Sequence, residues 1–178
     1  MIPYGKQDIN QADIDSVVNV LKSDFLTQGP QIPLFEKYVS DYCGASSAVA
    51  VNSATSALHI ACLALGLGKG DRLWTSPNTF VASANCGLYC GANVDFVDID
   101  PKTYNLCAEE LEKKLIQARK DNNLPKIVIP VHFAGQSCDM EKICAIAKKH
   151  NIAVIEDCAQ STGARFGEKR VGSWGDAA

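Results

Sequence analysis

The sequence predicts an α/β fold with a mostly parallel sheet, and two features of the chain support this. Short runs of β-branched residues alternate with longer segments that have helical periodicity. The short runs are apolar throughout instead of alternating between apolar and polar, which is typical of strands covered on both faces. We therefore expect three layers, α/β/α, in which helical crossovers connect parallel strands.

The expected strands are the β-branched runs 48–51, 72–75, 94–97, 127–131 and 152–155. The expected helices, which carry apolar residues at helical spacing, are 11–23, 32–42, 54–65, 80–89, 108–121 and 140–150. Residues suited to a left-handed C-cap stand at Gly66, Gly91 and Asn151, and Asp139 offers an N-cap to the last helix. No repeat or linker divides the chain, so we expect residues 1–178 to be one domain or part of one.

Composition limits the classes of protein to consider. The 178 residues are 47% apolar and carry a net charge of -3, so the chain can bury a core and its charge is too small to favour nucleic-acid binding. Residues 1–10 contain no apolar run suited to secretion, and no stretch approaches the roughly 20 apolar residues of a membrane span. We expect a cytoplasmic protein.

Eight cysteines raise the question of disulfides or a metal site. A cytoplasmic location argues against disulfides, and no Cys-x-x-Cys pair occurs. Cys86 and Cys90 lie four residues apart in an expected helix, but no second pair of Cys or His follows at zinc-site spacing. We interpret the cysteines as small buried apolar residues and expect no metal site.

The first candidate binding segment is 52–58, which follows the expected strand 48–51 and opens the next helix. A strand-to-helix turn leaves backbone amides free at the positive end of the helix dipole, and this is a natural phosphate site. The hydroxyl groups of Ser53 and Thr55 are additional donors. The alternative is that Ser53 serves only as the N-cap. The segment is neither a Walker loop nor a Rossmann fingerprint, because both glycine patterns are missing.

The second candidate segment begins with Glu156 and Asp157, directly after the expected strand 152–155. Ligands of open α/β sheets bind at the carboxyl ends of the strands. A carboxylate there can pair with the protonated ring nitrogen of an aromatic cofactor, and Asp157 is the candidate. Consecutive strand residues point to opposite faces, so only one of the two acids should face a ligand. The alternatives are that Asp157 caps the following turn and that Glu156 faces solvent.

An aromatic residue, Phe80, ends the third candidate segment, 75–80, which also lies at the carboxyl end of an expected strand. Its ring can lie flat over an aromatic ligand, although a phenylalanine at a helix start more often belongs to the core. His132 follows the strand 127–131 and can face the ligand, whereas His59 and His150 are interpreted as structural. The histidines share no metal-ligand spacing, and no nucleophile elbow of a hydrolase is present.

These segments together resemble the sugar aminotransferases of the DegT/DnrJ/EryC1/StrS family, a branch of the fold-type I pyridoxal-phosphate enzymes. The segments that carry the resemblance are 2–7, 26–30, 49–58, 75–80, 129–132, 155–157 and 172–176. Each is only modestly specific, but their order and spacing are matched across essentially the whole chain. The resemblance implies the large domain of that fold and pyridoxal 5'-phosphate as the cofactor.

The resemblance also implies a role for each of five residues. Ala54 and Thr55, which follow the candidate donor at position 53, hold the cofactor phosphate. Phe80 stacks on the pyridine ring. Asp157 pairs with the ring nitrogen, and Gln160 contacts the ring hydroxyl group.

Two stretches, 2–9 and 75–100, are most similar to the branch of the family that acts in pseudaminic acid biosynthesis. That similarity implies transamination at C4 of a UDP-linked 4-keto-6-deoxy-N-acetyl sugar, with glutamate as the amino donor. The family resemblance further implies a homodimer.

In the family, the segment that corresponds to 172–176 leads into a further strand and then to the lysine that forms the Schiff base with the cofactor. We therefore expect that lysine beyond Ala178, and no lysine of this sequence stands at its place. Residues 1–178 are then a truncated large domain, without its remaining strands and the small C-terminal domain, and are expected to be inactive alone. Two alternatives stay open: a keto-sugar 3-dehydratase of the same family, with histidine in place of the lysine, and a non-catalytic remnant.

Overall fold

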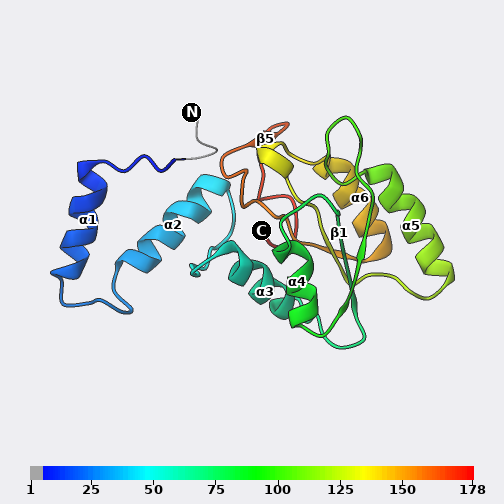
Figure 1. Cartoon of the computed structure of the whole chain (residues 1–178), viewed down its shortest axis with the longest axis horizontal. Coiled ribbons are helices and arrows are strands. Elements are labelled where there is room, and N and C mark those ends of the chain that lie inside the picture. Colours follow the sequence, from blue (N-terminus) through cyan, green and yellow to red (C-terminus); the bar gives the residue numbers. More distant parts are fainter. Residues whose placement is uncertain (1–5) are drawn as a thin grey trace.

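The structure is a computed structural model that describes residues 6–178. A parallel sheet lies at the centre of the molecule (Figure 1). Its four strands are β1 (Arg72–Thr75), β2 (Asn93–Phe96), β3 (Ile127–Ile129) and β4 (Ala153–Val154), in the order β2-β1-β3-β4. All three pairings within this sheet are parallel. The predicted mostly parallel sheet is confirmed, with four of its five expected strands.

Within residues 6–178, six α-helices precede or surround this sheet. They are α1 (Gln11–Leu21), α2 (Gln31–Cys43), α3 (Ala54–Ala64), α4 (Ala82–Tyr89), α5 (Ala108–Lys120) and α6 (Met140–His150). The six predicted helices are therefore confirmed. The predicted caps are present as well: φ is 73° at Gly66, 76° at Gly91 and 56° at Asn151. The Asp139 side chain accepts a hydrogen bond from the amide of Lys142.

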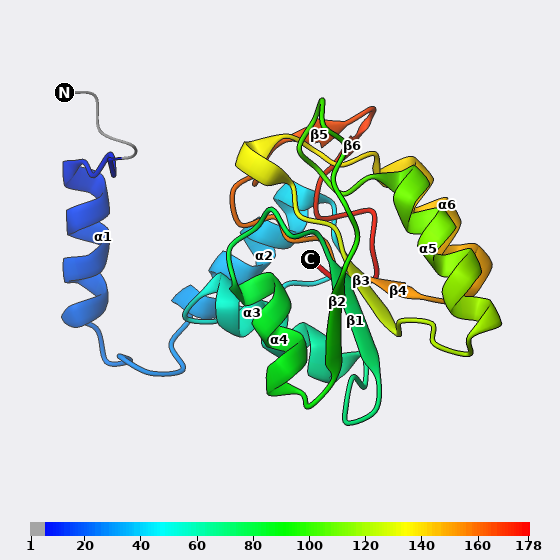
Figure 2. The ribbon, with the colours of Figure 1, turned by 45° about the vertical axis from the view of Figure 1, so that its right-hand side comes forward.

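Figure 2 shows α3 and α4 on one side of the sheet and α5 and α6 on the other. Successive residues of β1 and β3 pack against opposite layers. Leu73 and Ile127 belong to a buried cluster with residues of α3 and α4. Trp74, Val128 and Val154 belong to a second cluster with residues of α5 and α6. Helices cover both faces of the sheet, and the three-layer prediction is confirmed. The expectation that the strands are apolar throughout was wrong for two of them, because β1 begins with Arg72 and ends with Thr75, and β2 alternates polar with apolar residues and is largely exposed.

Helices α1 and α2 lie beside this layered unit, with α1 at the far end (Figures 1 and 2). Neither helix contains a buried residue, and the apolar side chains of Val17, Leu21 and Tyr38 are exposed. Local signals nevertheless define α1, because Asn10 and Asp13 form a reciprocal capping box at its start. Among residues 6–178, the structure contains no helix with the length and apolar character needed to cross a membrane.

The segment 48–51 is not a strand, so that prediction was wrong. The amide of Ala50 donates to Glu36 Oε1 at 2.8 Å instead of to a neighbouring strand, and Val49 is exposed. β-branched residues favour an extended chain, but a strand also needs a backbone partner, and none of the described strands pairs with this segment. The segment 2–7 of the family resemblance lies mostly outside the described residues.

Two short elements have no counterpart in the sequence-based prediction. One is a 3-10 turn, η1 (Phe133–Gly135), and the other is the antiparallel hairpin of β5 (Arg165–Phe166) and β6 (Lys169–Arg170). Isolated parallel bridges join Val131 to Asp157 and Ile155 to Ala177. The first bridge extends the pairing of β3 with β4 to the end of the sheet where the candidate residues lie.

Helix α4 approaches the sheet closely at Gly87, where a Cβ atom would lie 2.9 Å from Val94 Cγ2 and 3.2 Å from Leu73 Cβ. We expect Gly87→Ala to lower the free energy of unfolding by about 1–3 kcal/mol, because the added methyl group overpacks this contact. Urea denaturation measures the change. Gly68→Ala is the control, since a Cβ atom there meets nothing within 4 Å. Equal denaturation midpoints for the two variants contradict the close packing at Gly87.

Candidate functional site

A cavity opens at the carboxyl ends of β3 and β4, beside the N-terminal end of α3 and the segment that leads into α4. Its lining residues are Ala54, Thr55, Leu58, Thr79, Phe80, Ala82, Val131, His132, Phe133, Asp157, Ala159 and Gln160. They come from four separate parts of the chain. Five of the six residues predicted to bind a cofactor are among them, and the sixth, Ser53, directly precedes the first. The fold thus brings the three candidate segments together at one place.

The first turn of α3 forms one end of this cavity. Ser53 is the N-cap, and its side chain accepts a hydrogen bond from the Ser56 amide at 3.2 Å. The amides of the first helical turn, at Ala54 and Thr55, have no acceptor within the helix and lie at the positive end of its dipole. The N-cap interpretation of Ser53 is confirmed, while a direct contact of Ser53 with a ligand stays a prediction.

The aromatic candidate, Phe80, is 73% exposed although it lines the cavity. It precedes α4, which begins at Ala82 and not at position 80 as predicted. An exposed phenylalanine is not held by core packing, so the interpretation of Phe80 as a core residue was wrong. Its ring is available to cover an aromatic ligand.

The two consecutive acids point to opposite sides, as the strand alternation predicts. Asp157 lines the cavity and is 8% exposed. Its Oδ2 accepts a hydrogen bond from Ser83 Oγ at 2.7 Å, and its Oδ1 accepts one from the Ala159 amide at 3.2 Å. The second bond confirms that Asp157 caps the following turn, while its pairing with a cofactor ring nitrogen stays a prediction.

Glu156 is buried on the other side of the strand, so the interpretation that it faces solvent was wrong. Its Oε1 accepts hydrogen bonds from the amides of Trp174 at 2.6 Å and Gly175 at 2.9 Å. Its Oε2 accepts from the amide of Gly172 at 2.9 Å and lies 3.1 Å from His132 Nε2. Burial alone would raise the pKa of Glu156, but these four bonds outweigh it and hold the pKa below its usual range.

His132 was predicted as a residue that can face the ligand, and it lines the cavity, but its ring is engaged within the protein. Nδ1 accepts a hydrogen bond from the Cys138 amide at 3.1 Å, which places the ring proton on Nε2, toward Glu156. Cys158 lies close to both, and the possible ligand atoms of the three residues are within 4.8 Å of one another. Burial raises the pKa of the Cys158 thiol. His132 and Glu156 are therefore bonded to each other with Cys158 beside them, and the expectation of no metal site stays a prediction.

The last candidate, Gln160, contacts the loop that contains η1. Its Oε1 accepts a hydrogen bond from the Ala134 amide at 3.1 Å, which leaves its Nε2 group as a donor. Gly135 of the same loop, at a φ of 86°, approaches so closely that a Cβ atom there would lie 3.0 Å from the Gln160 carbonyl oxygen. The loop fixes the position of Gln160 at the edge of the cavity.

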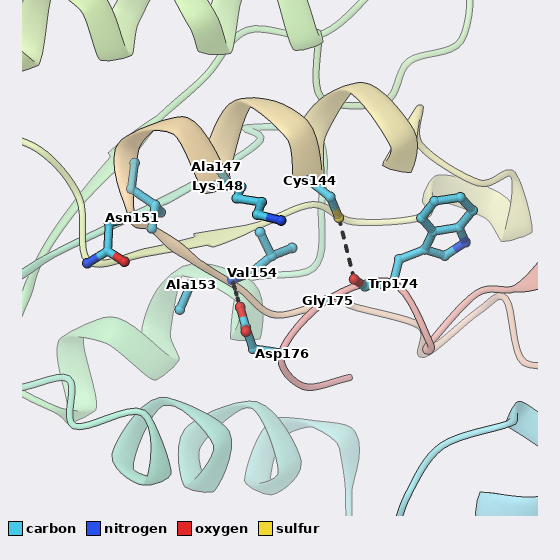
Figure 3. A pocket seen from close by; sticks show the side chains of 10 residues that line it. Cys144, Ala147, Lys148, Asn151, Ala153, Val154, Trp174, Gly175 and Asp176 are labelled. Carbon is cyan, nitrogen blue, oxygen red and sulfur yellow. Dashed lines mark hydrogen bonds between the residues drawn. The ribbon is translucent and has the colours of Figure 1, made fainter.

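A second, wider cavity lies at the open edge of the sheet between α6, β4 and residues 174–176, and Figure 3 shows its lining. Its polar groups are largely committed: the amide of Val154 donates to Asp176 Oδ2 at 2.9 Å, and the Cys144 thiol contacts the Trp174 carbonyl. None of the predicted cofactor residues lines it. The first cavity is therefore the candidate site, although it is the narrower of the two.

All eight cysteines are free thiols. Cys62 and Cys86 are fully buried in the core cluster beneath α3 and α4, which confirms their interpretation as apolar core residues. Cys90 is partly buried and packs against the same cluster.

The chain matches a known protein family over nearly its whole length. The DegT/DnrJ/EryC1/StrS aminotransferase family matches residues 7–178 of the chain. The chain belongs to this family. The resemblance found in the sequence is thereby confirmed.

Two curated relatives illustrate the similarity. GDP-perosamine synthase of Caulobacter vibrioides is 44% identical over 165 residues, which cover 92% of this chain and 43% of that protein. UDP-4-amino-4,6-dideoxy-N-acetyl-beta-L-altrosamine transaminase of Campylobacter jejuni is 40% identical over 176 residues, which cover 99% of this chain and 46% of that protein. The chain spans less than half the length of these relatives.

A solved structure confirms the fold. Helicobacter pylori PseC, an aminotransferase involved in the biosynthesis of pseudoaminic acid, matches with a TM-score of 0.89 and 30% identity, over 97% of this chain and 45% of that one. The chain therefore has the three-layer α/β fold of the fold-type I pyridoxal-phosphate enzymes.

Proposed function

We propose that this protein binds pyridoxal 5'-phosphate in the cavity between α3, the start of α4 and the ends of β3 and β4. One observation carries the proposal: five predicted residues, spread from Ala54 to Gln160, line a single cavity. Free amides at the first turn of α3 suit a phosphate group, and the carboxylate of Asp157 suits a protonated ring nitrogen. The exposed ring of Phe80 provides an apolar face between these two polar ends.

Each of these residues then has one task. Bound pyridoxal phosphate supplies an electron sink for the carbon atom that loses or gains a proton. Asp157 holds the proton on the ring nitrogen, and Phe80 covers one ring face and keeps water from it. Gln160 donates from Nε2 to the ring hydroxyl group. Ser53 acts through its N-cap bond, which orients the turn that holds the phosphate.

We further propose that the protein transfers an amino group from glutamate to C4 of a UDP-linked 4-keto-6-deoxy-N-acetyl sugar. Membership of an aminotransferase family supports the reaction type. The 40% identity to a UDP-4-amino-4,6-dideoxy-N-acetyl-beta-L-altrosamine transaminase supports the sugar nucleotide. The 44% identity to a GDP-perosamine synthase makes a GDP-linked keto sugar the alternative substrate.

We also infer the domain organisation, the oligomeric state and the cellular location of the protein. Residues 1–178 belong to one cofactor-binding domain, which the undivided four-stranded sheet supports. A homodimer is supported by the exposed apolar side chains of α1 and α2. A cytoplasmic location is supported by the eight free thiols, because reducing compartments keep cysteines in this form.

The test of this function uses the whole protein with isotope-labelled glutamate and either the UDP-linked or the GDP-linked 4-keto-6-deoxy sugar. We expect mass spectrometry to find the labelled nitrogen in the UDP-linked sugar. Label in the GDP-linked sugar alone identifies the alternative substrate. Loss of a sugar hydroxyl group without gain of label identifies a dehydratase and contradicts the proposed transamination. Protein without added cofactor is the control.

A further inference from the structure

Ser83 is a fully buried residue of α4 that no part of the sequence analysis selected. Its Oγ lies 2.7 Å from Oδ2 of Asp157, the acid proposed to pair with the cofactor ring. This separation is typical of a hydroxyl group that donates to a carboxylate, which is a stronger bond than one to a neutral acceptor. Ser83 itself does not line the cavity. Any effect that it has on a ligand therefore passes through Asp157.

The direction of this bond follows from the number of protons available. Ser83 Oγ has one proton and three possible acceptors, Asp157 Oδ2 at 2.7 Å, Thr79 Oγ1 at 2.7 Å and the Phe80 carbonyl at 3.2 Å. Only the carboxylate is charged, so it takes the proton. Thr79 Oγ1 lies 2.7 Å from Ser83 Oγ and therefore donates to it. Thr79 lines the cavity, so a chain of two hydroxyl groups runs from the cavity wall to the back of the Asp157 carboxylate.

Asp157 is thus held at both oxygens, by Ser83 at Oδ2 and by the Ala159 amide at Oδ1. Two bonds to different oxygens fix the rotation of the carboxylate group about its own axis. Each oxygen keeps a further lone pair, and one of them remains for a ligand donor. A single-atom donor, such as the N–H of a protonated pyridine ring, needs that lone pair to be aimed at it.

We propose that Ser83 is a positioning residue that sets the orientation of Asp157 toward the ring nitrogen of the cofactor. This inference rests on the proposed binding of pyridoxal phosphate and extends it to a residue outside the cavity. If Ser83 acts only by positioning Asp157, its contribution to binding affinity must depend on the ring nitrogen of the ligand. That contribution must vanish for a ligand that lacks this nitrogen.

The test measures the binding of two probes to the purified protein by fluorescence titration. One probe is pyridoxamine 5'-phosphate, and the other is its 1-deaza analogue, in which a carbon atom replaces the ring nitrogen. For Ser83→Ala we expect about tenfold weaker binding of pyridoxamine phosphate, from the loss of one charge-assisted hydrogen bond, and less than about twofold change for the analogue. Ser161→Ala is the matched control, since Ser161 is buried and its Oγ has no partner among residues 6–178.

The outcomes separate this inference from the function on which it rests. If the unaltered protein binds neither probe, the proposed function fails and the inference fails with it. If the unaltered protein binds pyridoxamine phosphate and Ser83→Ala binds it equally well, only the inference is overturned. Equal weakening for both probes also overturns it, because Ser83 then supports the cavity as a whole.

A second variant keeps the test decisive if Ser83→Ala does not fold. Thr79→Val removes the donor to Ser83 and leaves Ser83 itself in place. We expect the preference for pyridoxamine phosphate over the deaza analogue, measured as the ratio of their affinities, to fall about threefold, since one neutral hydrogen bond is lost. The same affinity ratio of the two probes in Thr79→Val and in the unaltered protein overturns the inference.

Discussion

Replacing Glu156 with glutamine should lower the free energy of unfolding by about 3–5 kcal/mol. The buried carboxylate accepts four hydrogen bonds, three from backbone amides of residues 172–175 and one from His132. Glutamine has one acceptor oxygen where glutamate has two, and its NH2 group would face two of these N–H donors. Those buried N–H groups would then have no acceptor. Urea denaturation at pH 7, followed by tryptophan fluorescence, measures the loss. The matched control is Glu168→Gln, because Glu168 is exposed.

The carboxylate of Glu156 should also make the free energy of unfolding depend on pH, and Glu156→Gln should remove that dependence. The pKa of Glu156 in the folded protein lies below the usual value of 4.5, because the four hydrogen bonds outweigh the effect of burial. The folded state therefore takes up this proton less readily than the unfolded state does. The stabilisation is complete above the unfolded pKa and is lost as the pH falls through the folded pKa. We expect the unaltered protein to lose stability below about pH 4.5 more steeply than Glu156→Gln. Parallel stability curves would falsify this account.

Replacing Asp157 with alanine should weaken the binding of pyridoxamine phosphate by about 100-fold. Removal of one partner from a desolvated, hydrogen-bonded charge pair costs about 2–5 kcal/mol, and the lower part of this range corresponds to that factor. The carboxylate is only 8% exposed, so water replaces it poorly. Equilibrium titration measures the affinity, with Asp24→Asn as the control at an exposed acid. An affinity within twofold of the unaltered protein excludes Asp157 as the partner of the ring nitrogen.

Much of the fold follows from the sequence because its signals are local. Asn151 and Gly91 end helices through a left-handed backbone conformation that their own residue types favour, and Asp139 starts one through a bond to an amide three residues away. The continuous apolar run of β3 likewise indicates burial on both faces without knowledge of its neighbours. These features depend on residue type and spacing alone.

The features that escaped prediction depend on partners far away in the chain. The segment 48–51 has the composition of a strand, but strand formation requires a second backbone, and residue type does not supply one. Glu156 reads as a surface acid until the fold brings residues 172–175 and His132 around it. The bond between Ser83 and Asp157 joins residues 74 positions apart. In contrast, Asp157 itself was predictable, because its place after a buried strand puts it at the ligand-binding edge of the sheet.

Two consecutive acids, Glu156 and Asp157, follow β4 and have different surroundings. Glu156 holds residues 172–175 from one side of the strand, and Asp157 faces the cavity from the other. Deleting or inserting one residue within 152–155 would turn every following side chain to the opposite side and exchange the two acids. Residues 121–123 have no such constraint, because they are exposed and β3 begins only after them. We therefore expect changes in chain length to be tolerated at 121–123 and not in the stretch 152–157.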